Sequence, residues 1–323
     1  MRRREFIAAL SGAAAMPFAA RAQQAMPVVG FLRSTSLVPF AHLGTALRQG
    51  LAEAGFVEGR DVRIESRYAD GQPDRLPLLA AELIRLPVAV VVGNDTSSRA
   101  AKAVTATTPI VFAGGGDPVR SGLVANMNRP GGNVTGVSFL SGVLGTKRLE
   151  LLRQFVPKAT SIAVLVNSNS PETAAERNEV IAAAQTIGLP IMIFDVGSDP
   201  EIEAAVASAV GRGANALFIG TGAFLASKRH ELVALAARHA LPAIYNAREA
   251  VDAGGLMSYS TSQAEAYRHA GLYAGRILKG EKPADMPVLQ ASKFEFVINL
   301  KTAKTLELEF HPQLLATADE VIE

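Results

Sequence analysis

The sequence predicts an α/β protein made of two doubly wound lobes, and three observations support this class. Short β-branched runs alternate with amphipathic stretches of roughly ten to twenty residues from Val28 onward, as in βα units around parallel sheets. Several runs are apolar on both faces, such as residues 88–92 (VAVVV), which is typical of strands buried between two helix layers. With 323 residues, the chain also exceeds the length that one hydrophobic core usually serves.

The pattern places the elements in a regular order. Strands are expected near residues 28–33, 62–68, 88–92, 110–113, 134–139, 161–166, 190–196, 216–220, 241–245, 255–259 and 294–298. Helices are expected near residues 38–55, 74–86, 97–106, 143–155, 172–187, 200–211, 224–239, 262–279 and 301–306. Local signals agree, because Pro200 suits the first turn of a helix and Gly188 suits the end of another.

Turn-forming residues divide the chain into blocks. The segment 129–133 (RPGGN) separates a first block of βα units from a second block over about residues 140–246, and Gly254-Gly255 opens a last stretch. If the helix near 262–279 returns to the first block, the two lobes are similar in size. A chain that crosses between lobes several times forms a hinge.

The N-terminus has the pattern of an export signal. Arginines at positions 2–4 precede a short apolar run, and Ala20-Arg21-Ala22 offers small residues for cleavage after Ala22. The arrangement Arg3-Arg4-x-Phe6-Ile7 is similar to a twin-arginine signal, and the alternative is an arginine-rich Sec signal. Both routes lead out of the cytoplasm, so residues 1–22 are expected to be a cleaved signal peptide.

Charge and cysteine content exclude several classes of partner. The net charge is +2 for the whole chain and +3 for residues 1–22, which leaves −1 for the mature protein and gives no reason to expect nucleic acid or a membrane surface as a partner. The chain has no cysteine, which excludes disulfides, thiolate metal sites and a lipid-modified N-terminal cysteine. We therefore expect a soluble periplasmic monomer without a metal or cofactor.

Motifs that would indicate an enzyme are absent. The chain has no phosphate-binding G-x-x-x-x-G-K-[ST], no H-E-x-x-H and no G-x-S-x-G, and Gly30 does not begin a G-x-G-x-x-G. The histidines have no neighbour at metal-ligand spacing and are expected mainly on exposed helix surfaces; they are His42, His230, His239, His269 and His311. We therefore predict no catalytic residue.

Candidate ligand-binding residues gather where the expected strands end, because ligands of open parallel sheets bind beyond the carboxyl ends of the strands. Most have small or hydrogen-bonding side chains. In the first block and the strand that follows it they are Ser34, Thr35, Asn94, Asp95, Thr96, Ser97, Gly115, Gly116, Asp117 and Ser138. In the remainder they are Asn167, Asn169, Thr221, Tyr245 and Tyr259.

Each of these candidates has a structural alternative. Segment 94–97 can receive a ligand carboxylate at a helix start, or Asp95 or Thr96 can simply cap that helix. Asp117 can pair with a ligand ammonium group, or it can form a turn before Pro118. Tyr245, Tyr259 and Phe139 can line a pocket or belong to the core. Because the chain lacks tryptophan and has few aromatics, an amino acid or small organic acid fits better than a sugar.

Five separated segments resemble a known family. They are residues 50–60 (GLAEAGFVEGR), 116–119 (GDPV), 128–136 (NRPGGNVTG), 277–285 (ILKGEKPAD) and 296–304 (FVINLKTAK). In this order they resemble the ABC-transporter substrate-binding family that includes tryptophan-binding proteins. Lipoprotein members carry an N-terminal cysteine that this chain lacks, and several members have simpler loops where it has residues 94–97.

The resemblance implies a type I periplasmic-binding-protein fold with a three-crossing hinge. One lobe would comprise residues 27–137 and 247–287, and the other residues 138–246 and 288–323. The protein would capture a small ligand between the lobes, an amino acid or other small carboxylate with aromatic ones among the candidates, and deliver it to an ABC permease of the inner membrane. Two alternatives remain: a ligand-sensing module of a receptor system with the same fold, and a secreted α/β enzyme acting at Asp117.

Overall fold

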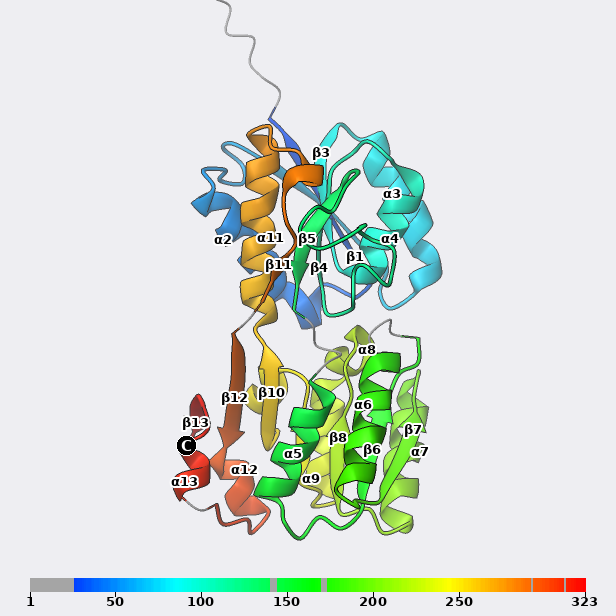
Figure 1. Cartoon of the computed structure of the whole chain (residues 1–323), viewed down its shortest axis with the longest axis vertical. Helices are drawn as coiled ribbons and strands as arrows, with labels where there is room; N and C mark the ends of the chain where they lie inside the picture. Colours follow the sequence, from blue (N-terminus) through cyan, green and yellow to red (C-terminus); the bar gives the residue numbers. More distant parts are fainter. Residues whose placement is uncertain (1–25, 140–143, 170–172, 292, 311) are drawn as a thin grey trace, which may run out of the picture.

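The protein forms two α/β lobes arranged end to end (Figure 1). The computed structural model describes residues 26–139, 144–169, 173–291, 293–310 and 312–323. The expected signal peptide, residues 1–22, lies outside the described residues. Within the described ranges, no helix is both long and apolar enough to span a bilayer.

The first lobe is a six-stranded parallel sheet in the order β11-β5-β4-β3-β1-β2. Its strands are β1 (Val28–Arg33), β2 (Arg63–Tyr68), β3 (Val88–Gly93), β4 (Ile110–Gly114), β5 (Val134–Ser138) and β11 (Leu289–Gln290). Its helices are α2 (Ala41–Glu53), α3 (Leu76–Arg85), α4 (Asp95–Val104) and α11 (Gln263–Leu278), with 3-10 turns η1 (Val38–Phe40), η2 (Pro73–Arg75) and η4 (Pro283–Asp285). Helices α2 and α11 cover one face of the sheet, and α3 and α4 cover the other.

The second lobe is a seven-stranded sheet in the order β13-β12-β10-β9-β8-β6-β7. Its strands are β6 (Ile162–Val166), β7 (Ile191–Asp195), β8 (Ala216–Ile219), β9 (Ala243–Tyr245), β10 (Met257–Thr261), β12 (Phe294–Asn299) and β13 (Glu320–Ile322). Its helices are α5 (Gly145–Phe155), α6 (Thr173–Thr186), α7 (Asp199–Gly211), α8 (Ala223–Ser227), α9 (Arg229–Arg238), α10 (Arg248–Asp252), α12 (Leu300–Thr305) and α13 (Pro312–Leu315). The pairing of β10 with β12 is antiparallel.

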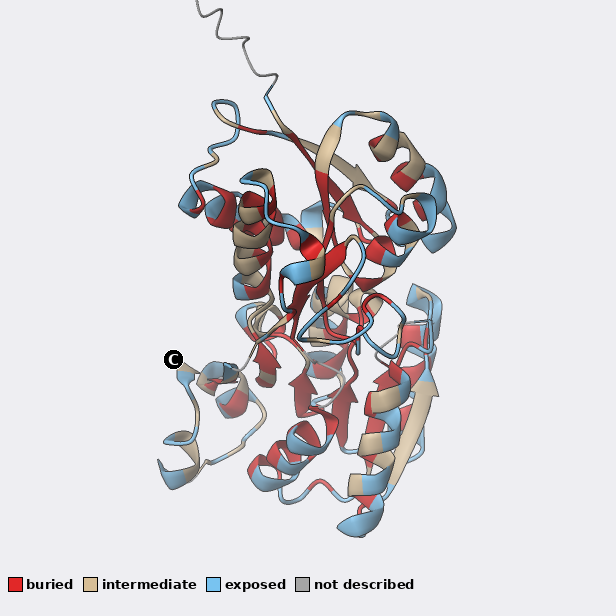
Figure 2. Ribbon diagram, turned by 45° about the horizontal axis from the view of Figure 1, so that its top comes forward, coloured by how far each residue is buried: buried red, intermediate tan, exposed pale blue. Residues whose placement is uncertain are grey.

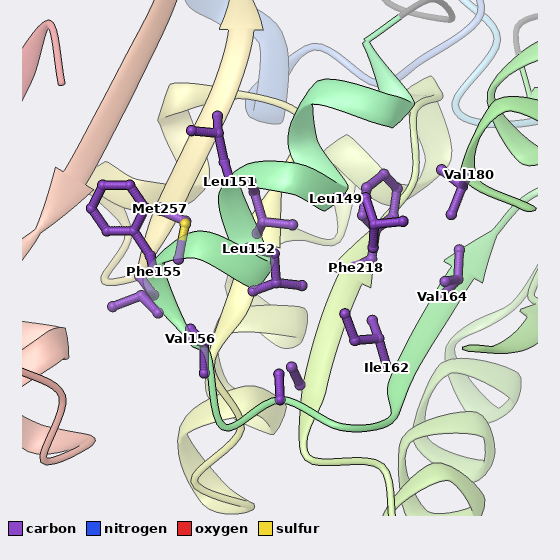
Figure 3. Packing of buried hydrophobic residues seen from close by; sticks show 14 of the residues in the cluster. Leu149, Leu151, Leu152, Phe155, Val156, Ile162, Val164, Val180, Phe218 and Met257 are labelled. Carbon is purple, nitrogen blue, oxygen red and sulfur yellow. The ribbon is translucent and has the colours of Figure 1, made fainter. Parts of the chain in front are cut away.

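Hydrophobic cores lie on both faces of each sheet. Buried residues concentrate on the strands and on the inner faces of the helices (Figure 2). In the second lobe, Leu149, Leu152 and Phe155 of α5 pack on Phe218 and other strand residues (Figure 3). Burial on both faces explains why the strand sequences are continuously apolar rather than alternating.

The chain passes between the two sheets at three places: from β5 to α5, from β10 to α11 and from β11 to β12. The three passages lie side by side. The Thr261 hydroxyl donates a hydrogen bond to the Phe139 carbonyl (2.9 Å), and the Ala291 N–H donates to the Ser138 carbonyl (2.8 Å). The lobes are therefore joined by three chain crossings, as the family resemblance implied.

Most predicted elements are present, with ends that differ from the prediction by no more than three residues. The helix predicted near 224–239 is instead two helices, α8 and α9, which meet at Lys228. The short elements α10, α13, β11 and β13 were not predicted. Short segments bury little surface and leave little periodicity in the sequence.

Sheet pairing also differs from the expected lobe boundaries. The prediction gave residues 247–287 to the first lobe, but β10 pairs with β9 and β12 and therefore belongs to the second sheet. The chain returns to the first lobe only after Thr261, where α11 begins, and leaves it again after Gln290 rather than after residue 287. The partner strand β12 is distant in sequence, so local pattern did not reveal this pairing.

Candidate functional site

A cavity of about 930 Å³ lies between the lobes and is lined by both of them. Its walls are the segments that follow β1, β2, β3, β4 and β5 in the first lobe and β6, β7, β8 and β9 in the second, together with the start of α11. The carboxyl ends of both sheets therefore face the same space. This is the position at which open α/β sheets bind ligands, and its volume is in the usual range for small-molecule sites.

Asn94 holds two first-lobe loops together at the cavity wall. Its Oδ1 accepts hydrogen bonds from the Ser34 N–H (3.2 Å) and from the Ser97 hydroxyl (2.7 Å), and its Nδ2 donates to the Ser34 Oγ (2.7 Å). Asn94 is the residue before the first turn of α4, but its side chain makes no capping bond to the helix. Its role is to fix the loop after β1 against the loop after β3.

Asp95 is a buried carboxylate at the first turn of α4. Its Oδ2 accepts a hydrogen bond from the Gly116 N–H (3.0 Å), and a methyl group at Gly114 would overlap the carboxylate. Glycine at position 114 is therefore required for this packing. Burial raises the pKa of Asp95, while the backbone N–H groups of Gly116 and Gly115 partly oppose that rise.

Arg33 is a buried cation at the carboxyl end of β1, with only 3% of its surface exposed. Its guanidinium lies 4.8 Å from the ring centre of Tyr267 and 5.5 Å from that of Phe40. Its Nη2 makes one long hydrogen bond to the Thr35 hydroxyl (3.4 Å), and among the described residues Nε has no acceptor. Burial lowers the pKa of Arg33 to about 10, so the side chain stays charged at neutral pH.

The second lobe contributes uncharged polar side chains that are fixed by hydrogen bonds to other residues of the same lobe. Asn167 donates through Nδ2 to the Val196 carbonyl (2.7 Å), and Asn246 donates to the Gly220 carbonyl (2.8 Å). The N–H and hydroxyl of Thr221 both donate to Glu176 Oε2, the hydroxyl at 2.9 Å. These bonds orient the three side chains at the cavity wall.

Glu176 is itself neutralised by a buried arginine. It forms an ion pair with Arg148, whose Nη1 donates to the Ile219 carbonyl (2.9 Å) and whose guanidinium lies 4.7 Å from the Phe218 ring centre. Both side chains are buried. Burial lowers the pKa of Arg148 to about 9, and the charge of the Glu179 carboxylate partly opposes that change.

The cavity brings together nine of the predicted site residues. They are Ser34, Thr35, Asn94, Asp95, Thr96, Gly115, Asn167, Asn169 and Thr221. Six others lie outside the lining: Ser97, Gly116, Asp117, Ser138, Tyr245 and Tyr259.

The residues outside the lining have local structural roles. Asp117 is exposed, and its Oδ1 accepts the N–H groups of Val119 (2.9 Å) and Arg120 (3.0 Å), which is the turn alternative stated above. Ser97 and Ser138 bond to backbone carbonyls. Tyr245 lies in the core of the second lobe, where burial raises its pKa.

Gly116 and Tyr259 also act away from the cavity. The Gly116 N–H binds the Asp95 carboxylate and so supports a lining residue indirectly. Tyr259 stacks on Phe294, with ring centres 5.9 Å apart, across the antiparallel pair of β10 and β12.

Several lining residues were not predicted. They are Arg33, Phe40, Gln263 and Tyr267 of the first lobe and Asp199, Phe224 and Lys228 of the second. A signal for Arg33 was present, because an arginine that ends an otherwise apolar strand must place its charge at the strand's carboxyl end. The remaining residues reach the cavity through tertiary folding, which local patterns do not record.

No three His, Cys, Asp or Glu side chains in the described part of the chain gather in a geometry that could hold a metal ion. The site is a polar and aromatic cavity between two hinged lobes. Fold and site together define the class of two-lobed binding proteins.

Comparisons with known proteins name the group within that class. The family model described as ABC transporter substrate binding protein matches residues 41–322. The chain belongs to this family.

Individual relatives agree with the family. A curated relative, the tyrosine-binding protein of Clostridioides difficile (strain R20291), is 25% identical over 262 residues, which are 81% of this chain and 75% of the relative. The structure of an ABC domain in complex with L-Trp from Streptococcus pneumonia has a TM-score of 0.84 and 27% identity and covers 92% of this chain and 99% of that one. A conserved domain protein from Vibrio cholerae shares the fold, with a TM-score of 0.85 and 23% identity over the same shares of the two chains.

Proposed function

We propose that this protein is the periplasmic solute-binding component of an ABC importer. It captures a small ligand in the cavity between the lobes and delivers it to a permease of the inner membrane. Under this proposal residues 1–22 direct export, and the mature protein is a soluble monomer that acts without turnover. The observation that carries the proposal is the cavity of about 930 Å³, whose walls come from the strand ends of both lobes across a three-passage hinge.

Two lobes joined by a hinge explain how a permease can detect that a ligand is bound. Contacts from both lobes to one ligand exist only when the lobes are closed, so the ligand shifts the population toward the closed form. A permease can then distinguish loaded from empty protein by shape.

We propose an amino acid as the ligand, with aromatic amino acids as the first candidates. The cavity has polar loops on one side and the rings of Phe40, Phe139, Phe224 and Tyr267 among its walls. This combination suits a ligand with a charged end and an apolar side chain. The printed names of two relatives point the same way, since one is a tyrosine-binding protein and the other is in complex with L-Trp.

A direct test is a thermal-shift screen of residues 23–323 against the twenty amino acids, aromatic acids and sugars, followed by calorimetry on the hits. We expect one site per chain and a rise in Tm for at least one amino acid, because a ligand that binds only the folded state stabilises it. At a ligand concentration of 100 times Kd, the stabilisation should be about 2.7 kcal/mol. No shift with any compound in a broad metabolite pool would contradict the proposal.

Delivery requires a second measurement. Reconstituted with the permease and ATPase of the importer, the loaded protein should stimulate ATP hydrolysis more than the empty protein does. Stimulation of a sensor kinase instead would support the receptor alternative.

A further inference from the structure

Five charged residues line the cavity, and three of them are already neutralised by other side chains. Asp70 pairs with Arg75 (3.0 Å), and Asp199 pairs with Lys228. The remaining two are Arg33 and Asp95. Within the described residues neither has an oppositely charged side chain within 4.0 Å, including each other.

Arg33 lacks an anion although it is 97% buried, since only 3% of its surface is exposed. The rings of Phe31, Phe40 and Tyr267 attract the cation but offer no hydrogen-bond acceptor. A guanidinium has five N–H donors, and here one makes a long bond while Nε has no partner. A buried charge without a counter-ion is costly, and a ligand carboxylate in the cavity would supply one.

Asp95 lacks a cation in the same way. Only 8% of its surface is exposed, and its bond comes from the uncharged backbone at Gly116. Arg99, one helical turn further along α4, favours the ionised carboxylate through space but does not form an ion pair with it. A ligand ammonium group would supply the missing positive charge.

The two charges lie at the ends of adjacent strands. Leu32 of β1 pairs with Gly93 of β3, so Arg33 lies one residue and Asp95 two residues beyond a paired position. Adjacent strands are about 4.8 Å apart, which places both side chains within reach of one small molecule. The second lobe faces this pair with the neutral groups of Asn167, Thr221 and Asn246.

We propose that Arg33 binds the carboxylate and Asp95 the ammonium group of a single zwitterionic ligand, an α-amino acid. This inference rests on the proposed function and specifies the recognition chemistry of its site. Both charged contacts come from the first lobe. The ligand therefore binds that lobe first, and closure of the second lobe removes water from the two ion pairs and strengthens them.

The test uses Arg33→Gln and Asp95→Asn, with calorimetry against three matched probes. The probes are L-tryptophan, tryptamine, which lacks the carboxylate, and indole-3-propionate, which lacks the ammonium group. The wild type should bind L-tryptophan most tightly. Each substitution should weaken L-tryptophan binding by about 30-fold or more, the range for truncating one partner of a buried charge pair.

The diagnostic result is a crossed pattern. Arg33→Gln should leave the affinity for tryptamine nearly unchanged, and Asp95→Asn should leave the affinity for indole-3-propionate nearly unchanged. A merely structural role for either residue would weaken all three probes equally and would overturn the inference. Circular dichroism and Tm establish that each variant is folded, and the two variants test the inference independently.

Control variants make the same two substitutions, arginine to glutamine and aspartate to asparagine, in an exposed ion pair of the first lobe. Arg60 and Asp61 are in contact (2.9 Å), and neither lines the cavity. Arg60→Gln and Asp61→Asn should bind all three probes as the wild type does. If another amino acid binds more tightly in the screen, that amino acid and its decarboxylated and deaminated forms replace the tryptophan series.

The outcomes separate this inference from the proposed function. Binding of a sugar or of an uncharged solute, without any amino acid, would overturn the zwitterion inference and leave solute capture standing. Amino-acid binding that both variants retain would do the same. No binding of any solute would overturn both.

Discussion

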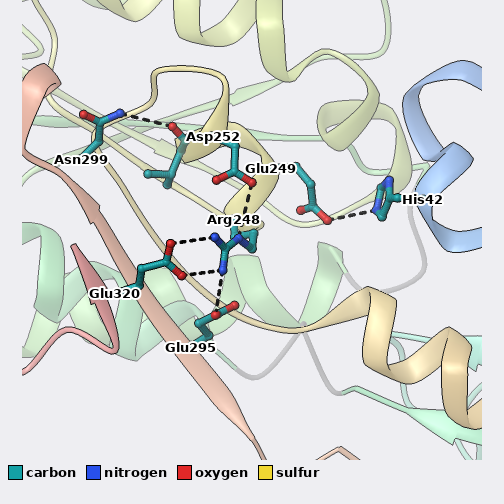
Figure 4. Close-up of polar contacts among 8 residues, drawn as sticks. His42, Arg248, Glu249, Asp252, Glu295, Asn299 and Glu320 are labelled. Carbon is teal, nitrogen blue, oxygen red and sulfur yellow. Dashed lines mark hydrogen bonds and ion pairs between the residues drawn. The ribbon is translucent and has the colours of Figure 1, made fainter. Parts of the chain in front are cut away.

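The two lobes are connected at the level of single residues by a side-chain contact outside the hinge. His42 on α2 of the first lobe lies 3.0 Å from the carboxylate of Glu249 on α10 of the second, as measured from Nε2 to Oε1 (Figure 4). Both residues are partly exposed. Burial alone would raise the pKa of Glu249, but the hydrogen bond from His42 and the charges of His42 and Arg229 outweigh it and hold the pKa below its usual value.

We expect this interlobe contact to make closure sensitive to acid. A carboxylate whose pKa is depressed in the closed form stabilises that form at a pH above its ordinary pKa, and it loses this contribution as the pH falls through the depressed value. We therefore expect ligand affinity to weaken below about pH 4.5, the region of an ordinary glutamate pKa. Calorimetric Kd values between pH 3.5 and 7 should show the loss.

Glu249→Gln tests the same contact at constant pH. The variant should bind ligand about 1.4- to 5-fold more weakly at pH 7, because partly exposed contacts of a carboxylate contribute about 0.2–1 kcal/mol. Its affinity should also vary less with pH in the acid range. Glu281→Gln breaks an exposed ion pair with Arg276 inside the first lobe and should behave as the wild type; equal acid sensitivity of Glu249→Gln and wild type would contradict the prediction.

At the scale of elements, two helices of the first lobe approach each other through glycine. A Cβ atom at Gly50 of α2 would overlap the Arg268 carbonyl of α11, and one at Gly271 would overlap the Leu47 carbonyl of α2. The contact is backbone to backbone, so a side chain cannot rotate away to make room. Because α11 returns to the first lobe from the hinge, this contact attaches the returning segment to the N-terminal segment.

Gly50→Ala should destabilise the first lobe. Overpacking of a rigid contact costs about 1–3 kcal/mol, although alanine is the better helix former. Chemical denaturation followed by circular dichroism measures the free energy of unfolding. The matched control is Gly211→Ala at the end of α7, where an added methyl group meets nothing within 4 Å; that substitution should be neutral or mildly stabilising. Equal effects of the two substitutions would show that the contact does not limit packing.

At the scale of the whole molecule, closure should be measurable as a change of shape. Both lobes line the cavity, and the hinge passages lie side by side at one edge, so the lobes can rotate about them without loss of either core. Small-angle X-ray scattering should show a smaller radius of gyration when a ligand found in the screen is added. The same radius with and without saturating ligand would contradict a hinge-closing mechanism.

The sequence predicted much of this architecture because buried parallel strands are apolar on both faces, so β3, β6 and β8 were visible as continuous runs. It did not predict that β10 joins the second sheet, since its antiparallel partner β12 begins only at Phe294. Strand-end loops were predicted as the ligand-facing edge, and loops from both lobes meet there. Asp117 lies outside the cavity lining because its carboxylate accepts backbone N–H groups of its own turn, whereas Arg33 belongs to the lining and packs against rings of α11 and η1. Local sequence pattern records neither the loop conformation nor the position of those rings.

The three passages also determine the order in which the molecule can be completed during synthesis. Strands β6 to β10 come from the single stretch 162–261, although the second sheet is completed only by β12 and β13 near the end of the chain. The first lobe needs residues 262–290 to supply α11 and its edge strand β11. Until those residues have left the ribosome, the face of β4 and β5 that α11 covers is bare. The N-terminal lobe, although made first, is therefore unfinished until about nine-tenths of the chain has been synthesised.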